Sequence, residues 1–218
     1  MGLLKEIFHK TGTNYSRECR QTLASGYHVS WYAIKGESLL SVIEKLGLRI
    51  IWEPNSKSGL QQAEEYNDRV FVKAVQSDYI LVVGLVWVGP QLEKHCKLFS
   101  ELQYFNICAI YNDAACWRKY VQGKLVRSYC YEGAYGVYED EGEMTKEEVE
   151  LGFSKFWKSA DYDETWDVEE WDYYHETAIF PYGNDVIDIA KAWGTDPSFE
   201  EDDAQGRGYV CKVPWKLF

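Results

Sequence analysis

The sequence predicts an α+β domain with a mainly antiparallel central sheet and helices packed on one face. Strand-like apolar runs follow one another closely in the middle of the chain, and amphipathic helical patterns stand on either side of them. With 46% hydrophobic and 16% aromatic residues, a chain of 218 residues can bury a sizeable core. We expect a single domain over residues 1–203, followed by a basic, apolar tail over residues 204–218.

The first elements are a strand, a helix and a second strand. Residues 26–36 alternate as a strand does, and residues 48–52 form a shorter apolar run that leads into a predicted loop at 54–59. Between the two strands, apolar residues recur at helical spacing before the stop signal of Gly47; they are Leu39, Val42, Ile43 and Leu46.

The middle of the chain predicts the body of the sheet. Strands are expected at 69–75 and 78–90, and the unbroken apolar run of the second indicates the sheet centre. A helix is expected at 91–102, with Leu92, His95, Phe99 and Leu102 on one stripe. Three strand-like runs with short turn-forming links then predict an antiparallel meander; they are 103–111, 115–121 and 124–133.

Two further helices are expected in the C-terminal third. Thr145 and Glu148 have the spacing of a capping box for the first helix. The second begins near Asn184 or Asp185 and ends at Gly194; its buried residues are expected to be Val186, Ile189, Ala190 and Trp193. The tail 204–218 is too apolar for a free end, so we expect it to pack on its own domain or on a neighbour.

Three stretches carry a resemblance to known proteins: WYAIKGESLLSVIEKLGL, YFNICAIYNDAACWRKYVQGKLVRSYCYEG and DVIDIAKAWGTDP. They resemble blocks of a family of small uncharacterised bacterial cytosolic proteins, over roughly residues 26 to 200. The resemblance implies one fold that opens with a strand and a helix and closes with a helix. It implies no activity.

The cysteines and the longest apolar run bear on location. The six cysteines include no CxxC pair and mostly lie in apolar strand-like runs, which predicts reduced, core-filling thiols in a cytoplasmic protein. The longest apolar run, from Tyr79 to Gly89, has about half the length that a membrane-spanning helix needs. We therefore expect no membrane association.

The net charge of −12 is concentrated in the acidic-aromatic C-terminal third, residues 139–203, which carries 22 acidic and 4 basic residues, a net charge of −18. Residues 1–138 carry 13 acidic and 16 basic residues, a net charge of +3. So acidic a region repels nucleic acid and anionic membranes and attracts a cationic partner.

The segment ADYDETWDVEEWDYYHE, residues 160–176, is the densest part of this region, with eight carboxylates, two tryptophans and three tyrosines. On a helix, most of its aromatic residues share one side, and Glu169, Asp172 and Glu176 line another. This pattern fits either a solvated acidic face or a docking surface for a basic protein. The candidate partner-binding residues are Asp161, Asp163, Glu164, Trp166, Asp167, Glu169, Glu170, Trp171, Asp172 and Glu176.

No motif predicts a catalytic site, a metal site or a cofactor. The acidic segment approaches the spacing of a calcium loop, but Trp166 stands where the loop needs glycine. His95 and Cys96 are adjacent, and neighbours on a helix point about 100° apart, so we expect His95 to be a satisfied core histidine.

A small basic group lies on the predicted meander: Arg118, Lys119, Lys124 and Arg127. Alternation divides these residues between two faces, which makes a weak footprint for RNA. We expect them to pair with acidic residues of the C-terminal third.

These observations favour a non-enzymatic interaction protein, most concretely an immunity-type inhibitor that occludes a basic partner such as a toxin. One alternative is an enzyme with a carboxylate cleft in the C-terminal third, with or without a divalent metal. A second alternative is an oligomeric scaffold that uses the tail.

Overall fold

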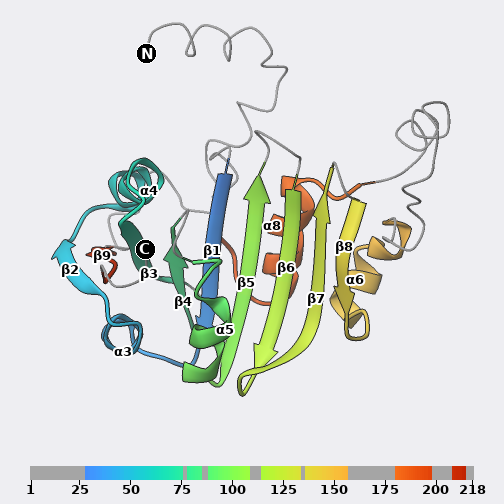
Figure 1. The fold of residues 1–218 in the computed structure, drawn as a ribbon, viewed down its shortest axis with the longest axis horizontal. Coiled ribbons are helices and arrows are strands. Elements are labelled where there is room, and N and C mark those ends of the chain that lie inside the picture. The colour runs from blue at the N-terminus through green and yellow to red at the C-terminus, as the bar shows by residue number, and fades with distance from the viewer. Residues whose placement is uncertain are drawn as a thin grey trace, which may run out of the picture.

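The computed structural model describes residues 28–75, 78–84, 88–108, 114–133, 136–156, 180–197 and 208–214. These residues form a nine-stranded sheet in the order β2-β9-β3-β4-β1-β5-β6-β7-β8 (Figure 1). Every neighbouring pair of strands is antiparallel. The predicted α+β class and antiparallel sheet are confirmed.

The strands account for all the predicted ones and add two more. They are β1 His28–Lys35, β2 Arg49–Trp52, β3 Arg69–Val75, β4 Tyr79–Val83, β5 Glu101–Cys108, β6 Ala114–Val121, β7 Lys124–Glu132, β8 Gly136–Glu141 and β9 Tyr209–Lys212. Strands β5, β6 and β7 form the predicted meander. Gln122 and Gly123 both have positive φ, 49° and 72°, as a two-residue hairpin turn requires.

The helices within the described ranges are short. They are α3 Leu39–Lys45, α4 Ser56–Glu65, α5 Leu92–His95, α6 Lys146–Glu150 and α8 Gly183–Ala192, with 3-10 turns η3 Cys96–Leu98 and η4 Phe153–Lys155. The Ser38 side chain caps α3, and Thr145 and Glu148 form the predicted capping box of α6. Helix α8 buries Val186, Ile189 and Ala190, as predicted.

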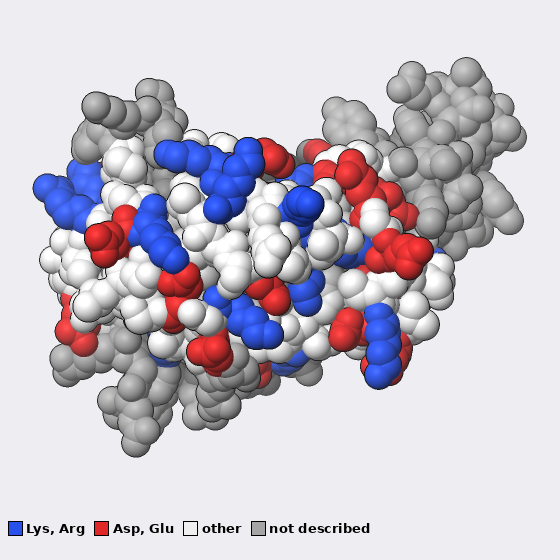
Figure 2. All heavy atoms as spheres, turned by 90° about the horizontal axis from the view of Figure 1, so that it is seen from below, with Lys and Arg blue, Asp and Glu red and all other residues white. Residues whose placement is uncertain are grey.

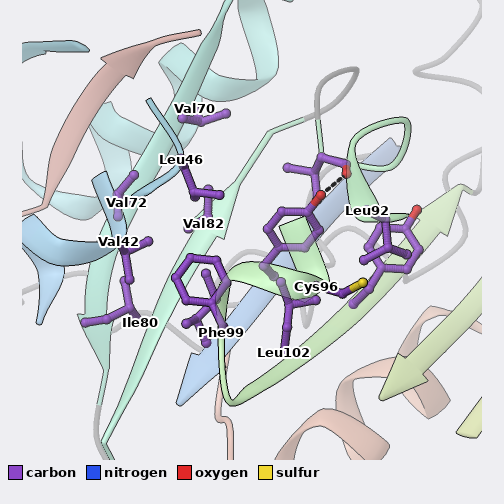
Figure 3. Packing of buried hydrophobic residues seen from close by; sticks show 14 of the residues in the cluster. Val42, Leu46, Val70, Val72, Ile80, Val82, Leu92, Cys96, Phe99 and Leu102 are labelled. Carbon is purple, nitrogen blue, oxygen red and sulfur yellow. Dashed lines mark hydrogen bonds between the residues drawn. The ribbon is translucent and has the colours of Figure 1, made fainter. Parts of the chain in front are cut away.

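The helices cover both faces of the sheet rather than one. On one face, α8 and η4 pack Trp193 and Phe153 against the sheet residues Trp31 and Trp117. On the other, α3 and α5 supply Val42 and Leu92, and the residues that directly follow α3 and η3 supply Leu46 and Phe99. These side chains pack against sheet residues such as Val70, Val82 and Leu102 (Figure 3). The central strands are apolar on both sides, and all five residues of β4 are buried, so each face needs its own cover.

Three local predictions were wrong. The predicted loop at 54–59 contains the start of α4, whose Gly59 lies against the ring of Phe71. The predicted helix at 91–102 ends at Leu98, because Glu101 already begins β5. The strand predicted at 78–90 ends at Val83, and residues 88–90 form a turn.

Part of the tail belongs to the sheet. Strand β9 lies between β2 and β3, so residues 209–212 pack on their own domain. Val210 and Cys211 are completely buried. A boundary after residue 203 therefore does not separate this strand from the domain.

The prediction of reduced cysteines was wrong for two of them. Cys116 on β6 and Cys130 on β7 lie directly opposite each other and form a disulfide. Among the other described cysteines, Cys96, Cys108 and Cys211 are thiols. Direct opposition in an antiparallel pair brings two side chains within bonding reach, and the sequence alone does not specify which cysteines are opposed.

Candidate functional site

The ten candidate partner-binding residues, Asp161 to Glu176, lie outside the described residues. The structure describes the residues on both sides of their segment. Phe156 is buried, with its ring centroid 6.1 Å from that of Tyr129, and the Phe180 ring stacks on Tyr131 at 4.9 Å. Tyr129 and Tyr131 are two residues apart on β7, so both flanks of the acidic segment are anchored beside one strand.

The neighbouring edge strand, β8, is itself acidic. Glu139, Asp140 and Glu141 follow one another on it, and Glu143 comes shortly after. Figure 2 shows acidic side chains gathered at this end of the molecule, which carries β8 and α6. Sequence reasoning missed this strand. The alternation of buried Val137 with exposed Tyr138 was its only local signal.

Two of these carboxylates are held by arginines of the meander. Arg118 Nε donates to Glu139 Oε1 at 2.9 Å, and Arg127 Nη1 donates to Asp140 Oδ1 at 2.5 Å. This confirms that Arg118 and Arg127 pair with acidic residues of the C-terminal third. Lys119 instead lies 3.8 Å from Glu101, on the neighbouring strand β5. The exposed carboxylates of Glu141 and Glu143 remain directed to solvent.

A buried ion pair fixes this end of the sheet. Arg127 is 1% exposed and Glu148 is fully buried; Arg127 Nε donates to both carboxylate oxygens, at 2.8 and 2.9 Å. The Trp117 indole N–H donates to the same carboxylate at 2.9 Å, and the backbone N–H of Thr145 donates at 2.7 Å. Since Glu148 belongs to α6, the network clamps α6 onto β6 and β7. It is a support for the acidic end rather than a reactive centre.

A second polar cluster lies where α8 ends. The Tyr79 hydroxyl donates to Glu101 at 2.8 Å, and the Gln103 amide donates to Glu101 at 2.9 Å and to the Trp193 carbonyl at 3.2 Å. Burial raises the pKa of Glu101, but the two hydrogen bonds and the charges of Lys119 and Lys35 outweigh it and leave that pKa lowered. The carboxylate is thus ionised and saturated with donors, which is a structural arrangement.

His95 is the buried core histidine that the sequence predicts. The Tyr32 hydroxyl donates to the Val88 carbonyl and lies 3.2 Å from His95 Nδ1. Nδ1 of the neutral ring is therefore the donor to the Tyr32 oxygen. Burial lowers the pKa of His95 to about 4, with a contribution from Lys94, while burial raises the pKa of Cys96. A neutral thiol beside a weakly basic imidazole is not an activated nucleophile.

Within the described ranges, no group of three or more His, Cys, Asp or Glu side chains is arranged to hold a metal ion. None of the described helices is long and apolar enough to cross a membrane. Comparison of the chain with family models, with curated proteins and with solved structures found no match. The resemblance to a family of bacterial proteins stays a prediction.

Proposed function

We propose that this chain is a non-enzymatic acidic interaction protein, an immunity-type inhibitor that binds a basic partner such as a toxin and occludes its active site. One observation carries the proposal: Phe156 and Phe180 hold the flanks of the acidic-aromatic segment against β7, next to the acidic strand β8. The described flanks of the most acidic part of the chain therefore lie beside an acidic strand.

Electrostatic complementarity is the physical basis of this function. Carboxylates gathered at one end attract a basic surface over a distance and raise the rate of encounter. Glu139 and Asp140 are already paired with arginines, so the attracting charges are those of Glu141 and Glu143 together with the segment 160–176. Trp166 and Trp171 would anchor the complex, since tryptophan offers a large rigid contact area at an interface.

The first test is a pull-down from the native source with the tagged chain, at low and at high salt. We expect one basic protein in stoichiometric amount, bound at low salt and released at high salt, because salt screens attraction between exposed charges. Mass spectrometry then identifies it. Recovery of the tagged chain alone at both salt concentrations would contradict the proposal.

The second test locates the binding charges. In the triple variant Glu169→Lys, Asp172→Lys and Glu176→Lys we expect association with the captured partner to slow by roughly tenfold or more at low salt, and its salt dependence to weaken. A matched control reverses three exposed carboxylates remote from β8, those of Glu44, Glu53 and Glu65. Equal association rates for the two triple variants would show that net charge alone acts, and would overturn the assignment to this segment.

A further inference from the structure

We propose that the protein forms a symmetric dimer by antiparallel pairing of the edge strand β2 with β2 of a second copy. This interaction surface is distinct from the acidic end and does not depend on the function proposed above. In the described part of the chain, β2 pairs with β9 alone and forms one end of the strand order. Its large apolar side chains remain 42–43% exposed at Ile50, Ile51 and Trp52. An edge with unpaired backbone groups and apolar side chains is a template for another strand.

A β-bulge decides which side chains of β2 share a face. Arg49 is opposite Lys212, Ile50 is opposite Cys211, and Trp52 is opposite Val210, so the register shifts at Ile51. Directly opposed residues lie on the same face of a sheet. Lys212 and Val210 are two residues apart on β9 and share a face, and therefore so do Arg49 and Trp52. Without the bulge, alternation would put Arg49 and Trp52 on opposite faces.

Arg49 can take a partner on its outer side. Across the sheet, Arg69, Lys212 and Arg49 stand in a row of directly paired positions. Asp68 forms ion pairs with the inner two, at 3.1 Å from Lys212 and 3.9 Å from Arg69. Arg49 is exposed, and the described ranges contain no carboxylate in ion-pair contact with it.

A two-fold axis through the middle of β2 supplies that partner. Antiparallel self-pairing about Ile50 and Ile51 sets Arg49 of each copy opposite Trp52 of the other, and Ile50 opposite Ile51. Because the axis is perpendicular to the sheet, both members of each Arg49–Trp52 pair lie on the same face of the continuous sheet. The guanidinium can then lie over the indole, a contact that is favourable for cations and that occurs twice in the dimer.

The charge distribution permits this association despite the net charge of −12. Strands β2 and β8 are the two ends of the nine-stranded order, and Figure 1 shows them at opposite sides of the molecule. At about 4.8 Å between strands, roughly 38 Å separate β2 from the acidic end, several times the Debye length of about 8 Å at physiological ionic strength. The dimer therefore holds its two acidic ends far apart and leaves both of them open.

Sedimentation equilibrium of the full chain tests the proposal. Chain concentrations from roughly 1 μM to 1 mM cover the dissociation constants expected of a small interface. We expect a reversible monomer–dimer equilibrium. The substitution Trp52→Arg sets Arg opposite Arg twice and should weaken the dimer about tenfold or more. The double variant Arg49→Trp with Trp52→Arg restores both pairs in reverse order and should restore most of the affinity. The control Val149→Arg places the same new charge at an exposed residue of α6 and should leave the equilibrium unchanged.

Circular dichroism of each variant verifies folding, which we expect to be intact because the side chains of Arg49, Trp52 and Val149 are exposed. A second variant, Ile51→Lys, tests the edge without using the Arg–Trp pair and should also weaken the dimer. A wild-type chain that stays monomeric over the whole range would overturn the proposal. So would a dimer that is as tight in Trp52→Arg and Ile51→Lys as in the wild type, since another surface would then form it.

Discussion

Glu148 is a carboxylate that the fold removes completely from water and surrounds with the donors of Arg127, Trp117 and Thr145. In Glu148→Gln the capping box can persist, since glutamine serves it as well as glutamate. Arg127, however, loses one of the two carboxylates that neutralise its buried charge. We expect the free energy of unfolding in urea to fall by about 3 kcal/mol. Glu150→Gln, which removes an exposed ion pair with Lys146 on the same helix, should cost less than about 1 kcal/mol. Equal losses would refute the assigned role of the buried pair.

His95 makes the stability of the folded protein depend on pH. Its pKa falls from an ordinary 6.5 to about 4 in the fold, because burial disfavours the imidazolium. Between these pH values the unfolded chain binds a proton that the folded protein does not bind. The free energy of unfolding therefore decreases as the pH drops from 6.5 towards 4, by at most about 3 kcal/mol from this group.

The variant His95→Gln isolates that contribution, since it keeps an N–H donor for the Tyr32 oxygen. Carboxylates titrate alike in the two proteins, so the difference in free energy of unfolding between wild type and variant is the quantity to measure. As the pH falls from 6.5 to 4, we expect the free energy of unfolding of the wild type to decrease relative to that of the variant. A difference that is constant with pH would contradict the neutral buried state of His95.

At the scale of elements, helix α4 packs closely on the sheet at Gly59. Its Gly59 and the Gly208 that precedes β9 lie against the same buried ring, that of Phe71, and a Cβ on Gly208 would come within 2.5 Å of it. Glycine in the middle of a helix normally costs about 1 kcal/mol relative to alanine. Here the close approach to the ring favours glycine, because an added methyl group has no space.

Gly59→Ala should therefore destabilise the protein by roughly 1–3 kcal/mol instead of stabilising it. Thermal unfolding followed by circular dichroism measures the change. Combining it with Phe71→Leu should give less than the sum of the two single losses, since the smaller side chain leaves room for the methyl group. Gln61→Ala, at an exposed position of the same helix, should change stability by less than about 0.5 kcal/mol. A gain in stability for Gly59→Ala would show that α4 does not rest on Phe71 as described.

At the scale of the whole molecule, the last strand of the sheet, β9, lies between two strands from the first half of the chain. Strand β9 separates β2 from β3, and its removal would leave β2 without a neighbour and expose the interior at Phe71 and Val70. Ending the chain after Arg207 should therefore give an insoluble protein or one without a cooperative thermal transition. A soluble truncated chain with an unchanged near-ultraviolet circular dichroism spectrum would contradict this prediction.

The sequence by itself determined the features that rest on local spacing. Helical periodicity located α3 and α8, the Thr145–Glu148 capping box located α6, and the turn at Gln122-Gly123 located the meander. The concentration of acid in residues 139–203 is likewise a property of composition, and the proposal of a basic partner rests on it.

Tertiary structure alone decided what depends on contacts between distant residues. Helix α4 has few apolar residues and forms where Gly59 contacts Phe71. Strand β9 has its place only because β2 and β3 flank it. The opposition of Cys116 and Cys130 follows from the register of β6 and β7. The pairings of Arg127 with Glu148 and Asp140 likewise need two segments brought together. Periodicity and composition report a residue's preference for burial or for solvent, whereas only the folded chain specifies which buried or charged group lies opposite it.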